Sequence, residues 1–118
     1  MNIPMNKILA FTTLALSITS SVVMAADDSN IDQMHKDYMQ SMGGMKDDMH
    51  HGVMSNDPDV AFAQGMLPHH QGAVDMARIQ LKYGKDPEMR ALAENIIKAQ
   101  DAEMAQMKAW LKAHPEKK

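Results

Sequence analysis

The chain has 118 residues, 14 of them methionine and none cysteine, and its formal net charge is −3 at pH 7. This mild negative charge argues against nucleic acid as a partner, because nucleic-acid-binding proteins carry a clear basic excess. The absence of cysteine excludes disulfides, thiolate metal sites and a cysteine nucleophile, so the fold must rest on one modest core.

Residues 1–25 are predicted to be a signal peptide. Lys7 supplies a short positive start, residues 8–23 form an apolar run, and Val23 and Ala25 are the small residues expected before a cleavage site. The apolar run of about 16 residues is shorter than the roughly 20 that a membrane-spanning helix needs. We therefore expect export to a bacterial periplasm, with no membrane insertion of the mature chain.

The next segment, residues 26–56, is rich in methionine and histidine and is predicted to be either helical or a mobile arm that orders on metal. Two short helices are expected, over residues 30–40 and 45–54, because Gly43 and Gly44 interrupt the pattern.

This segment has few of the branched apolar residues of an ordinary core helix, and a core of methionine alone is poorly specified. If it were one continuous helix, its methionines would share a face with His35. We expect Met42, Met45 and Met49 to contact metal. His50 and His51 are either a nitrogen pair suited to Cu(II) or simply solvated.

Two long helices are predicted over residues 57–114. Each begins where an aspartate precedes a proline, at Asp57 and Asp86, since aspartate caps a helix and proline fits its first position. Gly84 ends the first helix and leaves only a short turn, which predicts an antiparallel hairpin. Together with the two shorter helices, this predicts an all-α fold, a small four-helix bundle.

The first long helix places histidine and methionine on one arc, which we expect to be buried: Phe62, Met66, His69, Ala73, Met76, Ala77 and Gln80, with His70 at its edge. Met66 precedes the two histidines by three and four residues and can reach the same point. Thioether sulfur is soft and suits Cu(I) and Ag(I). Pro68 is expected to kink the helix beside them. Met66, His69, His70 and Met76 are therefore candidate ligands, with core packing as the alternative.

The second long helix has a matching arc: Met89, Ala93, Ile96, Ile97, Gln100, Glu103, Met104, Met107 and Leu111. A buried amide or carboxylate is costly unless it is paired. We expect Gln100 and Glu103 either to pair with His69 or His70, fixing the rings behind the metal, or to reach solvent. Met104 and Met107 either donate sulfur or fill the core.

The span 62–111 carries Phe62-x-x-x-Met66-x-x-His69-His70-x-x-Ala73-x-x-Met76-Ala77, followed by Ala93-x-x-Ile96-x-x-x-Gln100-x-x-Glu103-x-x-x-Met107-x-x-Trp110-Leu111. It resembles the periplasmic CopM-like copper-binding family, formerly a domain of unknown function. The resemblance implies a ferritin-like helical bundle, copper binding, and a role in copper resistance or trafficking. It supports Met66, His69, His70, Met76 and Met107 as ligand positions, whereas Met104 departs from the branched aliphatic residue expected there.

The leading hypothesis is a non-enzymatic periplasmic protein that sequesters copper, mainly Cu(I) with Ag(I) or Cu(II) as further loads, and passes it to a copper-donating or copper-accepting periplasmic protein. Di-iron catalysis is not expected, because the chain has no Glu-x-x-His motif. The alternative is a metal-independent helical chaperone or stress protein with a methionine-rich client surface. The oligomeric state, including a homo-oligomer, is left open.

Overall fold

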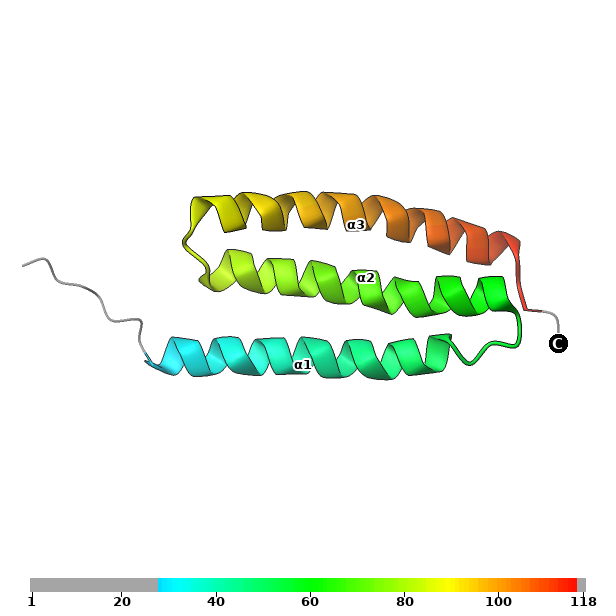
Figure 1. Cartoon of the computed structure of the whole chain (residues 1–118), viewed down its shortest axis with the longest axis horizontal. Helices are drawn as coiled ribbons and strands as arrows, with labels where there is room; N and C mark the ends of the chain where they lie inside the picture. The colour runs from blue at the N-terminus through cyan, green and yellow to red at the C-terminus, as the bar shows by residue number, and fades with distance from the viewer. Residues whose placement is uncertain (1–27, 117–118) are drawn as a thin grey trace, which may run out of the picture.

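The computed structural model describes residues 28–116 and folds them into three helices without a strand (Figure 1). The helices are α1 (Asp28–Gly52), α2 (Pro58–Tyr83) and α3 (Pro87–Ala113). The all-α prediction is confirmed for this part of the chain. The predicted signal peptide, residues 1–25, lies outside the described residues. None of the three helices is long and apolar enough to cross a membrane.

Aspartate side chains cap the starts of α2 and α3, as the sequence predicted. The Asp57 carboxylate accepts hydrogen bonds from the backbone N–H groups of Asp59 and Val60, at 2.9 and 3.3 Å. Asp86 accepts from the N–H of Met89 at 2.9 Å. In both helices a proline fills the first position, where its missing N–H costs nothing. The predicted end of α2 at residue 83 is also confirmed.

Arg90 fixes the turn between α2 and α3. Its Nη1 donates to the carbonyl oxygens of Leu81, at 2.8 Å, and Gly84, at 2.9 Å. These carbonyls belong to the end of α2 and its turn, where backbone acceptors lack helical partners. The guanidinium, in the first turn of α3, therefore supplies hydrogen bonds to backbone carbonyls at the end of α2. The chain reverses at this turn, so that α3 lies beside α2 (Figure 1).

The three helices form an open layer with α2 in the middle (Figure 1). α2 packs against α1 on one side and α3 on the other, and no Cα atom of α1 lies within 8 Å of one in α3. The prediction of four helices is wrong for the described residues, because the two short upstream helices are one. A closed bundle would bring the outer helices together, and this layer leaves two sides of α2 uncovered.

The predicted break at Gly43 and Gly44 does not occur, and α1 runs through both glycines. Two interior glycines cost about 2 kcal/mol of helix propensity relative to alanine. Tertiary contacts with α2 offset this cost, because α1 is anchored on both sides of the glycines. No described glycine adopts a positive φ, so neither glycine terminates the helix.

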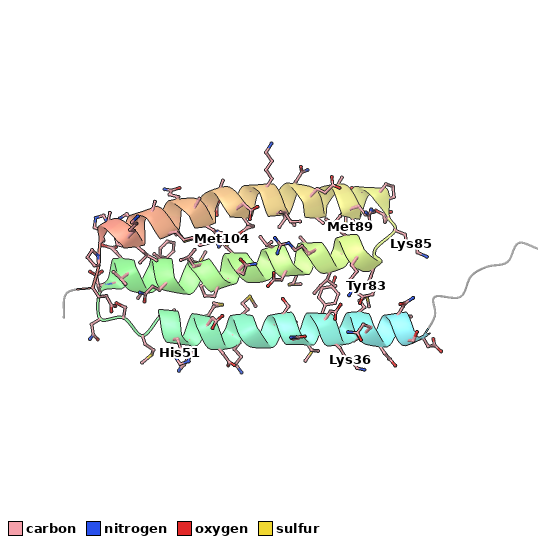
Figure 2. The ribbon with its side chains drawn as sticks, turned by 180° about the vertical axis from the view of Figure 1, so that it is seen from behind. Lys36, His51, Tyr83, Lys85, Met89 and Met104 are labelled. Carbon is pink, nitrogen blue, oxygen red and sulfur yellow. The ribbon has the colours of Figure 1, made fainter. Side chains whose placement is uncertain are left out.

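The anchor before the glycines is polar. The Asp37 carboxylate accepts hydrogen bonds at 2.8 Å from both the Lys82 ammonium and the Tyr83 hydroxyl of α2. The hydrogen bond from Lys82, with smaller contributions from Gln33 and Tyr83, lowers the pKa of Asp37 to about 2 and raises that of Lys82. Figure 2 shows Tyr83 pointing from α2 toward α1.

The anchor after the glycines is a close backbone contact between Gly52 and the Gln64 carbonyl, which leaves no room for a Cβ at residue 52. Pro68 sits inside α2 four residues after Gln64 and has no N–H to donate to that carbonyl. Pro68 therefore frees the backbone group against which α1 packs. The sequence analysis connected Pro68 only with the neighbouring histidines, whereas in the structure Pro68 also contributes to the packing of α1 against α2.

The core is small and follows two stripes of α2, one under each neighbour. The buried residues of α2 are Val60, Ala63, Gly65, His70, Gly72, Val74, Ala77 and Ile79. α3 contributes only Ala93 and Met104, and α1 contributes none. The predicted buried arc of α2 was wrong, since only its Ala77 is buried, whereas the arc predicted for α3 contains both of that helix's buried residues. A helix flanked on two opposite sides buries two stripes, and the arc predicted as core lies between them.

The Asp37 cluster predicts how α1 responds to acid. A lowered pKa means that the cluster stabilises the fold fully above the ordinary carboxyl pKa, and that this contribution is lost as the pH falls from about 4 toward 2. We expect Asp37→Asn to remove this acid-sensitive step and to speed backbone amide exchange in α1 at neutral pH. Hydrogen exchange should show the change in α1 before α3, and equal protection of α1 in both proteins at neutral pH would contradict the assignment.

Candidate metal centre

One uncovered side of the layer, here called the open face, carries most of the methionine and histidine candidates. At 100° per residue, Phe62, Met66, His69 and Met76 lie between the two buried stripes of α2. Phe62 lines a depression together with Met107 and Trp110, so the side of α3 that carries these two residues borders the same face. The open face comprises Met42 and Met49 of α1, Phe62, Met66, His69 and Met76 of α2, and Met89, Leu92, Met107 and Trp110 of α3. Met45 lies between α1 and α2 and lines the groove on the opposite side of the layer.

The register between α2 and α3 brings two candidate sulfurs level with each other. Leu81 faces Arg90 and His70 faces Glu103, so residues whose numbers sum to about 173 lie side by side. Met66 lies one turn from His70, and Met107 lies one turn from Glu103 on the neighbouring helix. Both methionines are half-buried. The register thus places Met66 and Met107 within one helical turn of the His70–Glu103 pair.

The register between α1 and α2 adds methionines from the other side. The Met45 side chain packs over Gly72, where a Cβ would collide with its sulfur. The Val53 side chain similarly covers Gly65, so residue numbers across this pair sum to about 117. Met49 is therefore level with His69, and Met42 is level with Met76. Sulfur donors thus line the open face on both sides of His69.

His70 lies beneath this face, buried between α2 and α3, and one of its ring nitrogens has no partner. Its Nε2 forms a hydrogen bond with the carboxylate of Glu103, whose side chain is 61% exposed. An ionised carboxylate can only accept, so Nε2 carries the proton. In the neutral ring the lone pair is then on Nδ1, which is buried without a hydrogen-bond partner in the described protein.

The arrangement of His70 and Glu103 is typical of a metal-binding histidine. Carboxylates commonly hold one nitrogen of such a ring and leave the other free to coordinate. The sequence analysis considered a pairing of Glu103 with either histidine, and the structure has it with His70. The adjacent His69 is exposed, and the two ring centroids are 6.0 Å apart.

Some candidates lie away from this group. Met104 is only 6% exposed and is wedged between α3 and α2, near Leu67 and on the side opposite the open face (Figure 2). His50 and His51 are exposed, and Figure 2 shows His51 on the edge of α1 away from α2. Gln100 is half-buried, its Oε1 buried without a partner, and it pairs with neither histidine in the described structure.

The opposite side of the layer is polar. A groove between α1 and α2 on that side is lined by Asp37, Asp48, Gln71, Asp75 and Arg78, among others. The sequence analysis assigned neither this groove nor the Asp37 cluster, because their members are some 30 to 45 residues apart in the chain. The layer therefore has one charged side and one side of thioethers, aromatic rings and imidazole.

The chemistry of the available donors restricts the metal. Among residues 28–116, no three or more His, Asp or Glu side chains gather into a group that could hold a metal ion. The candidate site would therefore draw on methionine sulfur as well as imidazole. Thioethers favour Cu(I) and comparably soft ions over hard ions such as Mg²⁺.

Met104 is predicted to be structural rather than a ligand. Met104→Ala should destabilise the protein by about 2–5 kcal/mol, because it removes a buried side chain and leaves a cavity. Met39→Ala is the matched control, since Met39 is 68% exposed and such substitutions usually cost within about 0.5 kcal/mol. Urea unfolding measures both, and equal stabilities would refute the assignment.

Comparison with known proteins places the chain in a family. The model of the family described as "Domain of unknown function (DUF305)" matches residues 59–118, just over half of the chain. The chain therefore belongs to the DUF305 family. No protein in the curated collection matches it. The matched region contains α2, α3 and the His70–Glu103 pair, whereas α1 precedes it.

Proposed function

We propose that this DUF305 protein is a periplasmic copper-binding protein that sequesters Cu(I) and passes it to a partner in copper resistance or homeostasis. The observation that carries the proposal is the unpartnered Nδ1 of His70, whose Nε2 is held by Glu103, one helical turn from Met66 and Met107. The resemblance of the 62–111 motif to CopM-like copper proteins supports the same assignment.

The ligand set we propose is centred on His69 and His70. Met66 and Met107 are level with them on α2 and α3, and Met49 approaches from α1. Met42 and Met76 form a second group of sulfurs toward the other end of the open face, and Met45 lies nearby over Gly72, between α1 and α2. Thioethers need no deprotonation and cannot form disulfides, so they stay available in an oxidising compartment where thiols are lost.

Exposure of these ligands favours transfer over permanent storage. Met42 and Met76 are 47% and 42% exposed, and His69 is exposed. A partner that presents its own sulfur or imidazole can reach the metal and take over its ligands one at a time. The proposed role is therefore non-enzymatic, with copper as cargo and the partner a copper-donating or copper-accepting periplasmic protein. Ag(I) has the same ligand preference and is an expected second cargo, and Cu(II) is the expected cargo of His50 and His51.

A histidine-pair comparison tests the proposed site. His69→Ala/His70→Ala should weaken Cu(I) binding at least tenfold, while His50→Ala/His51→Ala should leave it unchanged, because only the first pair adjoins the thioethers. Anaerobic titration of the exported protein against a chromogenic Cu(I) chelator measures this, with Zn(II) as the metal control and circular dichroism to verify folding. Unchanged Cu(I) affinity in the first variant would rule out this site.

Glu103 is proposed to position His70 rather than to bind metal. Glu103→Gln should weaken Cu(I) binding about 10–100-fold, as is usual when the carboxylate behind a metal-binding histidine is lost. It should also change the pH dependence of binding, because the amide no longer fixes the proton on Nε2. A variant that kept the affinity and pH profile of the parent would show that the pair is only structural.

A metal-independent chaperone is the second candidate, favoured by the exposed apolar side chains of the open face. Phe62 is 65% exposed and Leu92 is 49% exposed, and methionine adapts readily to different partners. Suppression of client aggregation in the presence of a copper chelator would support this function, whereas tight Cu(I) binding without such activity would support the copper protein.

A further inference from the structure

We propose that the open face is a self-association surface, on which a second copy of this chain packs face to face. In the part of the chain that the structure describes, most of the exposed large apolar side chains, including Phe62, Met76 and Leu92, lie on this one side of a layer only one helix thick. The occupant is identified from the size of the face, its charge and the incompleteness of the core.

The core of the single layer is too small to account for the fold alone. Its buried apolar residues are mostly alanine and valine, and Val74 is the one large side chain with less than 2% of its surface exposed among the described residues. Larger side chains stay on the open face, with Phe62, Met89 and Leu92 between 43% and 65% exposed. Large apolar patches are uncommon on the surface of monomers and mark an interaction surface.

The size of the face fits a stable dimer. α2 has 26 residues, so it is about 39 Å long, and three helices about 9 Å apart make a face about 27 Å wide. This footprint is roughly 1,000 Å² on each copy, against about 800 Å² per partner in a standard protein interface. A second copy would also bury the uncovered sides of all three helices at once.

The charge distribution is compatible with a copy of the same chain. Asp75, Arg78 and Lys82 of α2 lie on the other side of the layer or at its edge. At the open face the exposed carboxylate of Glu103 is held by His70. A two-fold arrangement sets each surface against itself, so like charges would repel, and a face with few charges limits this repulsion. Methionine side chains then interdigitate easily because they are flexible.

Pairing would place ligands of two copies against each other. His69 and the thioethers around it project from the face that the partner covers, so one copy's sulfurs lie within reach of the other's imidazole. This consequence rests on the proposed function, whereas the association itself does not. The metal would then be held between two copies, and transfer to another protein would require one copy to be displaced or opened.

Sedimentation of the exported protein in the presence of a metal chelator tests the association. We expect a dimer mass, and Leu92→Glu should raise the dimer dissociation constant at least tenfold, because it places a carboxylate on the face. Ala105→Glu is the matched control, since it adds the same charge to the exposed opposite side of α3. A monomeric parent at all concentrations, or equal effects of the two variants, would overturn the proposal.

A cross-linking experiment gives an answer that does not depend on how Leu92→Glu folds. The chain has no cysteine, so one can be introduced alone. Ala73→Cys, near the middle of the open face, should form a covalent dimer under mild oxidation faster than Arg78→Cys on the other side. Equal rates for the two variants would contradict face-to-face packing.

The same variants separate this inference from the copper assignment. If Leu92→Glu is monomeric and binds Cu(I) at least tenfold more weakly than Ala105→Glu, the site is shared between copies. If the parent is dimeric but binds no Cu(I), the association stands and the proposed function fails. If monomeric Leu92→Glu binds Cu(I) as tightly as the parent, the site is complete within one copy and the shared arrangement is wrong.

Discussion

The position of α2 between two helices that do not touch each other is the constraint on which the rest of this structure depends. A helix flanked on opposite sides must bury two stripes, and here both are built from small residues that allow close approach: Ala63, Gly72 and Ala77 are examples. The remaining two sides stay uncovered. The sequence makes one of them charged and the other rich in sulfur, so the packing of α2 decides which side chains reach the surface.

The packing of α1 against α2 adds a third helix to the hairpin that the family match covers, so that methionines from three helices lie on the open face. The matched region begins at residue 59, so α1 lies before it. Its methionines are aligned with those of α2 by the Asp37 contact with Lys82 and by the backbone contact at Gly52. Glycine propensity opposes a continuous α1, and those two contacts compensate for it. A weaker attachment would leave the methionines of α1 without a fixed position relative to His69.

Local signals in the sequence predicted the helix limits, because an aspartate cap and a first-position proline act within one turn. Long-range features were not accessible in the same way. Nothing near Arg90 shows that it will satisfy carbonyls of the preceding helix, and nothing near Asp37 identifies a partner 45 residues away. The arc through Met66, His69 and Met76 was recognised as one face, but periodicity does not say whether neighbours cover it. The sequence left open whether Glu103 pairs with a histidine or reaches solvent. It pairs with His70 because His70, rather than His69, is turned toward α3.

The central claim is that metal is bound by the methionines of one face, and methionine-methyl NMR of the purified protein tests it directly. Silver(I) is a suitable probe because it is diamagnetic and shares the preference of Cu(I) for sulfur. The account predicts that adding Ag(I) shifts the methyl signals of Met49, Met66 and Met107, and next those of Met42 and Met76, while the signals of Met39 and Met104 stay in place. Shifts spread evenly over all methionines, or confined to those outside the open face, would contradict it.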